Sequence, residues 1–531
     1  MVSGNAQNMK IFVRMLTLLL ALLMLGMTVV ACKEEVKEGG GGSQEVDEYG
    51  REGDDLPELN YMGQKITTLY WEDVENLEFD IEQITSDNVS NALYDRNGEI
   101  ERRLNVELDW VGEKGNANNM DNFVAAVERD KKSQTKAYDL IASYSRTEGM
   151  LAVRGYLVDM NDIGESHINL EKPWWPAELV ETVTIGDSMY FISGDIAPSV
   201  LYLMQGLCFN KSMLNEEWNT YAQSDEGGNF ESDRDEKGKE IASPACRMVY
   251  QWAYDGTWTL DKLIMLTMGT DNKGVGNIAG GEVANAKDKG DSYGFVSTNY
   301  QIETFYTGCN LRLVEPTTDG SVLKISDDFG SSKTVKLVNK LSDWFKEDTC
   351  FTDTTLGGER DYSTPFNAGR AMFLAVRVRH LGSLNVDWDA GILPMPKWDE
   401  KQTNYYTAMG YPFTLFGIYN GLDDLGDREA TYTMLTAVLE CWASESYRLV
   451  TPEVFEVNMQ LKYAETQYET DMFEIIRSSV VFDLGRVFNA DLSGMSTLPG
   501  TAAVKHASWS TTYGAYKKSL NKKLATIVAN L

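Results

Sequence analysis

The stretch KITTLYW, Lys65–Trp71, begins a regular alternation of strand and helix patterns after a charged, glycine-rich region. Its β-branched and aromatic residues are typical of a β-strand. In residues 88–104 apolar side chains recur at helical spacing, residues 106–111 alternate apolar and acidic, and residues 120–127 return to helical spacing. A short apolar strand, YDLIAS, follows at Tyr138–Ser143. This β-α-β-α-β order predicts a mostly parallel sheet covered by helices.

Further along the chain the same two patterns return. SYGFVST, Ser292–Thr298, is typical of a strand, and REATYTMLTAVLECWASESY, Arg428–Tyr447, is typical of a long helix. At 531 residues the chain is too long for one ordinary domain. We therefore expect two or three α/β lobes.

The chain is strongly acidic, with 80 Asp and Glu against 48 Lys and Arg and a formal net charge of −32. Phosphate backbones are bound by clustered Lys and Arg, so this balance argues against nucleic acid as a partner. A content of 43% hydrophobic and 11% aromatic residues is ample for packed cores.

The N-terminus has the pattern of an export signal. Lys10 and Arg14 precede an almost wholly apolar run, residues 15–30, which is short for a bilayer-spanning helix. The sequence Val29-Val30-Ala31-Cys32 resembles the bacterial lipobox, in which the cysteine is lipidated. We expect residues 1–31 to be a lipoprotein signal peptide, Cys32 to carry the lipid, and residues 32–59 to be a flexible tether.

Motifs that carry chemistry are nearly missing. There is no P-loop, no GxSxG, no CxxC, and only three histidines, so neither a cofactor nor a metal site is expected, and the chain is predicted not to be an enzyme. Five cysteines besides Cys32 do not form an obvious disulfide framework, although a bridge between Cys309 and Cys350 is possible.

Several segments, in this order, resemble the extracellular solute-binding proteins of ABC importers, family 1, in particular the sugar-binding group that includes maltose-binding protein. They are YDLIASYSRTEGMLAVRGYLVDMNDI (138–163), GDSMYFISGDIAPSVLYLMQGLCFNKSML (186–214), FNAGRAMFLAV (366–376) and DAGILPMPKWDEKQTNYYT (389–407). The resemblance implies an α/β, two-lobed periplasmic-binding-protein-like fold of type II, whose discontinuous lobes close on a ligand by hinge motion.

The resemblance also implies where the chain passes between the lobes. Crossings are expected near 193–199, 364–366 and 412–418, which gives lobe one residues 60–195 and 366–415, and lobe two residues 196–365 and 416–531.

Ligand contacts are expected just after the strands, because ligands of open α/β sheets bind beyond the carboxyl ends of the strands. By this rule the candidates are Trp71, Glu72, Tyr144, Ser145 and Arg146; to them we add Tyr202, Asn299 and Tyr300 from lobe two and Arg377 from the crossing strand. Each has a structural alternative: Trp71 and Tyr202 as core residues, Arg146 as half of an ion pair, and Arg377 on the other face of its strand.

Together these features predict a receptor at the outer face of the bacterial cytoplasmic membrane, lipid-anchored at Cys32, that captures a carbohydrate, an oligosaccharide, and delivers it to ABC permease subunits. Two alternatives stay open: a receptor for another solute such as a peptide, and an exported carbohydrate-active hydrolase. The sequence NLEKPWWPAELV, 169–180, adds two adjacent tryptophans between prolines, for which support of the fold is favoured over ligand contact.

Overall fold

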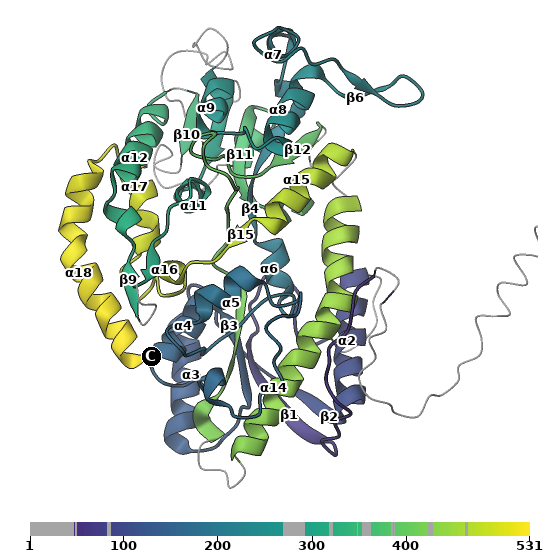
Figure 1. Ribbon diagram of the computed structural model, residues 1–531, viewed down its shortest axis with the longest axis vertical. Helices are drawn as coiled ribbons and strands as arrows, with labels where there is room; N and C mark the ends of the chain where they lie inside the picture. The colour runs from purple at the N-terminus through teal and green to yellow at the C-terminus, as the bar shows by residue number, and fades with distance from the viewer. Residues whose placement is uncertain are drawn as a thin grey trace, which may run out of the picture.

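The computed structural model describes residues 47, 50–81, 87–268, 292–317, 322–347, 349–352, 363–383, 386, 388–422, 428–461 and 466–531. The expected signal peptide and Cys32 lie outside the described residues. Figure 1 shows one sheet in the lower half of the molecule and another in the upper half, each surrounded by helices. Within the described part of the chain, no helix is both long and apolar enough to cross a bilayer.

The lower lobe is built on a four-stranded sheet with the order β14-β3-β1-β2. Its strands are β1 (Gln64–Trp71), β2 (Val106–Glu113), β3 (Leu140–Tyr144) and β14 (Thr414–Ile418). The first three are parallel, as their alternation with helices predicts, and β14 pairs antiparallel with β3.

Helices cover both faces of this sheet. On one face Trp442 of α14 (Arg428–Glu445) makes an edge contact with Trp110 of β2, and α14 also packs against α2 (Asn88–Leu104). On the other face lie α3 (Met120–Ser133) and α4 (Ser145–Val153). The expected helical face of α2 is buried, and Asp87 caps its first turn by accepting from the Ser90 amide.

The upper lobe is built on a five-stranded sheet with the order β10-β7-β11-β4-β12. Its strands are β4 (Gln205–Asn210), β7 (Tyr293–Ser297), β10 (Cys350–Thr352), β11 (Ala371–Arg377) and β12 (Ala390–Leu393). Strands β10, β7 and β11 are parallel, and β4 runs antiparallel between β11 and β12.

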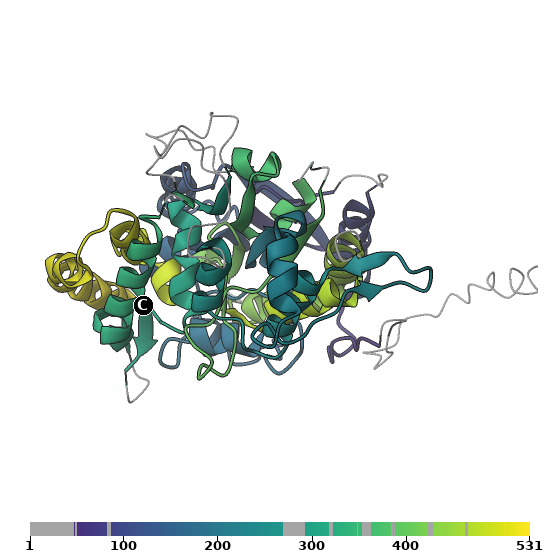
Figure 2. The ribbon, with the colours of Figure 1, turned by 90° about the horizontal axis from the view of Figure 1, so that it is seen from above.

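Aromatic side chains join part of this sheet to its helices, as where the ring centroids of Trp344 of α12 and Phe295 of β7 lie 4.6 Å apart. The helices of the upper lobe are α7 (Glu216–Ala222), α8 (Pro244–Tyr254), α9 (Leu260–Met268), α10 (Asn299–Ile302), α11 (Thr304–Gly308), α12 (Ser332–Trp344), α13 (Ser363–Asn367), α15 (Gln467–Ser478), α16 (Leu484–Val487), α17 (Leu498–Val504) and α18 (Trp509–Asn530). A hairpin, β5 (Asp233–Arg234) with β6 (Glu240–Ala242), projects from this lobe (Figure 2). The described cysteines, Cys208, Cys246, Cys309, Cys350 and Cys441, are buried free thiols.

The connections between the lobes differ in part from the prediction. The first connection runs from Ile192, which bridges to Phe416 in the lower lobe, to the start of β4 at Gln205 in the upper lobe. The assignment of 366–415 to lobe one is wrong for its strands, because β11 and β12 both pair with β4 of the upper lobe. The return therefore falls between β12 and β14, not near 364–366. Residues from 416 onward are also divided, since α14 belongs to the lower lobe and α15 packs on β12.

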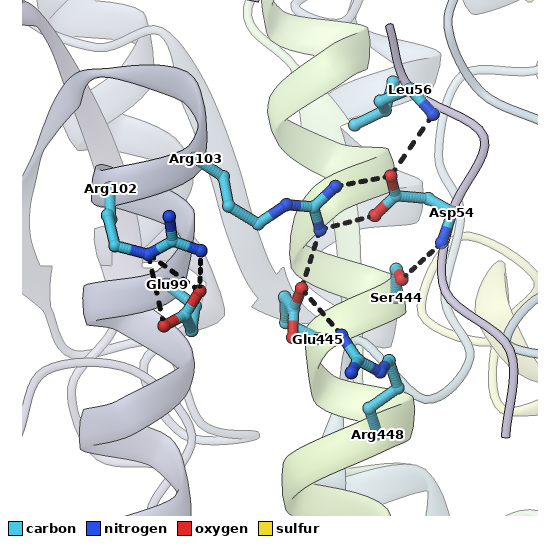
Figure 3. A network of polar contacts seen from close by, with 8 residues as sticks. All are labelled: Asp54, Leu56, Glu99, Arg102, Arg103, Ser444, Glu445 and Arg448. Atoms are coloured by element: carbon cyan, nitrogen blue, oxygen red, sulfur yellow. Dashed lines mark hydrogen bonds and ion pairs between the residues drawn. The ribbon is translucent and has the colours of Figure 1, made fainter. Parts of the chain in front are cut away.

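The segment 50–59, expected to be part of the tether, is instead fixed on the lower lobe (Figure 3). Asp54 is buried and its carboxylate binds both terminal nitrogens of Arg103 at 2.6 and 2.7 Å. Arg103 also binds Glu445 at 2.6 Å, and the Asp54 amide donates to Ser444 at 3.0 Å. Hydrogen bonding and the charge of Arg103 lower the pKa of Asp54 although burial opposes them. An ionised, fully paired Asp54 thus ties this segment to α2 and α14.

The tryptophan doublet lies inside the protein. Trp174 and Trp175 are 0% and 2% exposed, so they support the fold. The Trp175 indole donates to Glu440 Oε2 at 2.8 Å, and the Asn169 amide donates to the same oxygen at 3.1 Å. Burial raises the pKa of Glu440 to about 7.

This raised pKa predicts a pH-dependent contribution to stability. The carboxyl group of Glu440 has a pKa of 4.5 in the unfolded chain and about 7 in the folded protein. Its contribution to the free energy of unfolding is therefore fully present below pH 4.5 and is lost as the pH rises through 7. Glu440→Gln cannot ionise and keeps an oxygen that can accept from Trp175. We expect its melting temperature, relative to the parent protein, to be higher at pH 8 than at pH 5, with a free-energy difference of at most about 3 kcal/mol. A difference that is equal at both pH values, measured by thermal unfolding, would contradict this.

Candidate functional site

A hydrogen-bonded network ties the first connection to the lower lobe at the end of β1. The Trp71 indole donates to Thr414 Oγ1 at 3.0 Å, and Thr414 in turn donates to the carboxylate of Glu78. The same carboxylate accepts from the backbone amide of Ser199, at the start of α6 (Pro198–Tyr202) in the first connection. Arg96 lies beside it and donates to the Glu78 carbonyl at 2.8 Å. Burial raises the pKa of Glu78, while these hydrogen bonds oppose the shift.

A second polar cluster gathers around Tyr411, in the connection that leads to β14. Its hydroxyl donates to Glu303 Oε2 at 2.6 Å, and Arg486 of α16 binds Glu303 Oε1 at 3.0 Å. The guanidinium groups of Arg146 and Arg486 lie over the Tyr411 ring, 3.7 and 4.2 Å from its centroid. Arg146 comes from the lower lobe and Glu303 from the upper lobe, so the cluster bridges the two.

A third contact lies where the loop after β1 meets the end of β11. Arg377 Nη1 is 3.8 Å from Glu75 Oε2, and Arg379 forms an ion pair with the same carboxylate. Arg379 also lies 3.4 Å from Asn76 Oδ1. Burial and the neighbouring charges of Arg377 and Arg379 lower the pKa of His380 to about 4. Two guanidinium groups therefore lie together at this face of the upper lobe.

The structure brings several of the predicted ligand residues together. Trp71 and Tyr144 are buried with their rings 5.5 Å apart at the carboxyl ends of β1 and β3. The Tyr144 hydroxyl lies within electrostatic range of Arg146 and Arg377. Ser145 is buried and donates to the Tyr411 carbonyl at 2.7 Å, which fixes the start of α4.

Other predicted residues lie apart or outside the described side chains. Glu72 is exposed, and its carboxylate is beside Gly112 of β2, on the Tyr70 side of the strand. Tyr202 lies on α6, half-buried against the core. The backbone of α10 begins at Asn299, but the side chains of Asn299 and Tyr300 lie outside the described residues.

Sequence reasoning missed Glu303, Arg486 and Tyr411. Glu303 lies between two short helices and Arg486 on a one-turn helix, so neither follows a strand. Tyr411 could have been found, because it precedes Pro412 in the stretch expected to contain a crossing. Chemically, the assembled groups offer aromatic faces, hydroxyl groups and guanidinium donors. Among the described residues no group of His, Cys, Asp and Glu is placed to hold a metal ion.

Two hollows of about 420 and 560 Å³ lie at another part of the lobe boundary, and both are lined by Glu178, Ser478 and Val480. Glu178 of α5 (Ala177–Val183) binds Arg312 at 2.9 Å and accepts from the Phe482 amide at 2.7 Å. Burial raises the pKa of Glu178 to about 7, although Arg312 opposes the shift. The described side chains of the two lobes do not converge here on the carboxyl ends of strands, as they do around Trp71 and Tyr144 at the ends of β1 and β3.

No family model matches the chain, and no curated protein matches it. Among solved structures, the chain is similar to a maltose-binding periplasmic protein from Listeria monocytogenes in complex with maltose. The two are 12% identical with a TM-score of 0.51 over 87% of this chain and 98% of that one. A maltose-maltodextrin binding protein of Alicyclobacillus acidocaldarius is 10% identical, with a TM-score of 0.48 over 86% and 100%. The chain thus has the two-lobed α/β fold of periplasmic binding proteins.

The cluster around Tyr411 makes a direct prediction about stability. Glu303→Gln keeps the shape of the side chain but leaves the buried Arg486 without its nearest counter-ion, which we expect to lower the free energy of unfolding by about 3 kcal/mol. Urea unfolding measures the loss. Glu171→Gln, at an exposed position, is the matched control and should change stability by less than about 0.5 kcal/mol. Equal losses in the two variants would show that the ion pair does not stabilise the junction.

Proposed function

We propose that the chain is an extracytoplasmic receptor that captures a carbohydrate between its two lobes and delivers it to an ABC permease. The observation that supports this best is the convergence of side chains from both lobes at one place. Trp71, Tyr144 and Arg146 from the lower lobe meet Glu303 and Arg377 from the upper lobe at the carboxyl ends of β1 and β3. In open α/β sheets this edge is where ligands bind.

The chemistry of these groups suits a saccharide. Sugar hydroxyls accept hydrogen bonds from guanidinium and tyrosine donors and donate to carboxylates, and the C–H faces of a sugar ring pack on aromatic rings. The Listeria monocytogenes protein of the same fold named above is a maltose-binding protein in complex with maltose, which is consistent with this class of ligand.

Closure of the lobes would supply the affinity. A ligand shifts such a protein to the closed form only by contacting that form better, and here the candidate contacts come from both lobes. The hydrogen bonds of Glu78 to Thr414 and to the Ser199 amide fix the first connection to the lower lobe, and we assign Glu78 and Thr414 to holding the hinge, not to binding solute.

The lipid anchor and the membrane location are proposed from the sequence alone. The Val29-Val30-Ala31-Cys32 motif supports lipidation at Cys32 and a place at the outer face of the cytoplasmic membrane, and the permease follows from the receptor role. The alternatives remain a receptor for a peptide or another solute and, with less support, an exported hydrolase. No nucleophile or acid–base motif in the sequence favours catalysis.

A thermal-shift screen of residues 33–531 against mono- and oligosaccharides tests the proposal. A receptor that binds a sugar should melt a few degrees higher in its presence, because the ligand binds only the folded state. Chromatography of the sugar after incubation should show it unchanged. Turnover of the sugar would contradict the receptor function and indicate an enzyme. Stabilisation by peptides alone would contradict the carbohydrate ligand and indicate a peptide receptor.

A further inference from the structure

Arginines are concentrated at the lobe junction of a protein that is otherwise strongly acidic. Arg146 and Arg486 lie over the Tyr411 ring, and Arg377 and Arg379 reach Glu75 across the junction. The whole chain has a formal charge of −32, so this local excess of cations runs against its composition. The concentration of guanidinium groups therefore calls for an explanation in terms of what the junction binds.

The acidic groups that face these arginines are already engaged. Glu303 accepts from Tyr411 and pairs with Arg486, and Glu75 pairs with Arg379. Asp483 is close to Arg486, but its two oxygens accept from the backbone amides of Leu313 and Gly485 at 2.7 and 2.8 Å. The negative charges of Glu303 and Glu75 thus offset the positive charges of Arg486 and Arg379.

Arg146 is left without a counter-ion among the described residues. It is half-buried on the first turn of α4, its buried Nε–H donates to no acceptor in the described part of the chain, and its described contact is stacking on Tyr411 at 3.7 Å. A buried guanidinium donor that finds no acceptor is costly. A group brought by the ligand would remove that cost.

The neighbouring hydroxyl reports the local field. Burial raises the pKa of Tyr144, and the charges of Arg146, Arg377 and Arg486 act against that rise, with Glu303 alone reinforcing it. The cations thus surround the same point at the carboxyl end of β3 where the receptor proposal places the solute.

We propose that the solute held between the lobes carries an anionic group, a carboxylate or a sulfate, and that Arg146 binds this group with Arg377 beside it. This inference rests on the carbohydrate-receptor function proposed above and narrows it to acidic saccharides. A guanidinium group has only donors, arranged in a planar fork, and this fork matches the oxygens of a carboxylate or sulfate better than the mixed donor and acceptor character of a sugar hydroxyl.

Isothermal titration calorimetry with paired saccharides tests the inference. The probes are a galacturonic acid trimer, the same trimer with its carboxyls methyl-esterified, a sulfated chondroitin disaccharide, and maltotriose as a neutral sugar. We expect the protein to bind the uronate or the sulfated probe about 30-fold or more tightly than the esterified or neutral one. The uronate and sulfate arms distinguish the two anions.

Substitutions of Arg146 test its role in binding the anionic group. Arg146→Gln should lower the affinity for the anionic probe about 30-fold and change the affinity for any neutral sugar by less than about 2-fold. Arg146→Lys keeps the charge but not the planar fork of donors, so its affinity for the anionic probe should lie between those of the parent protein and Arg146→Gln. Arg154→Gln, at an exposed position at the end of the same helix, is the matched control. Thermal unfolding of each free variant checks that it is folded.

The outcomes separate this inference from the receptor proposal. Tight binding of maltotriose or the esterified trimer without preference for the acid would overturn the anionic ligand and leave the carbohydrate receptor standing. Binding of an anionic probe that Arg146→Gln does not weaken would overturn the role of Arg146. If the parent protein binds none of these saccharides and none in the wider screen, both proposals fall.

Discussion

The antiparallel pairing of β14 with β3 is the constraint on which the rest of the molecule depends. Thr414–Ile418 pairs residue by residue with Leu140–Tyr144, so a strand from late in the chain completes a sheet begun at Gln64. The chain must therefore leave the lower lobe, build the upper sheet, and return. Discontinuous lobes, the connections between them and the junction they enclose all follow from this one pairing.

The pairing also places the polar groups of the junction. It sets Thr414 opposite Tyr144, where its hydroxyl links the Trp71 indole to the buried Glu78 carboxylate. Tyr411, three residues earlier, then reaches Glu303 of the upper lobe. Burial makes each group dependent on its partner, because a buried polar group without one is costly. The hinge network and the arginine-rich site are thus adjacent but separate in role.

The local sequence pattern predicted the strands and helices of the lower sheet, but not the pairings between residues far apart in the chain. The alternation that begins at KITTLYW gave β1, α2, β2, α3 and β3, because periodicity and capping are properties of neighbouring residues. The pattern of β11 showed a strand but not its sheet, which depends on pairing with β4 some 160 residues away. Likewise, Asp54 looked like part of a tether because its partners, Arg103 and Ser444, are 49 and 390 positions distant. The strand-end rule points to Arg146 but not to Glu303 or Arg486, which lie beside or on short helical turns.

The proposed receptor function requires that the ligand bind between the lobes at this edge of the sheets. Hydrogen–deuterium exchange, with and without the saccharide that raises the melting temperature most, tests it most directly. We predict slower exchange in segments of both lobes at once, namely residues 71–78 and 144–147 from the lower lobe and 298–304 and 377–380 from the upper lobe. Slowing confined to one lobe, or to the hollows lined by Glu178 and Ser478, would contradict the account.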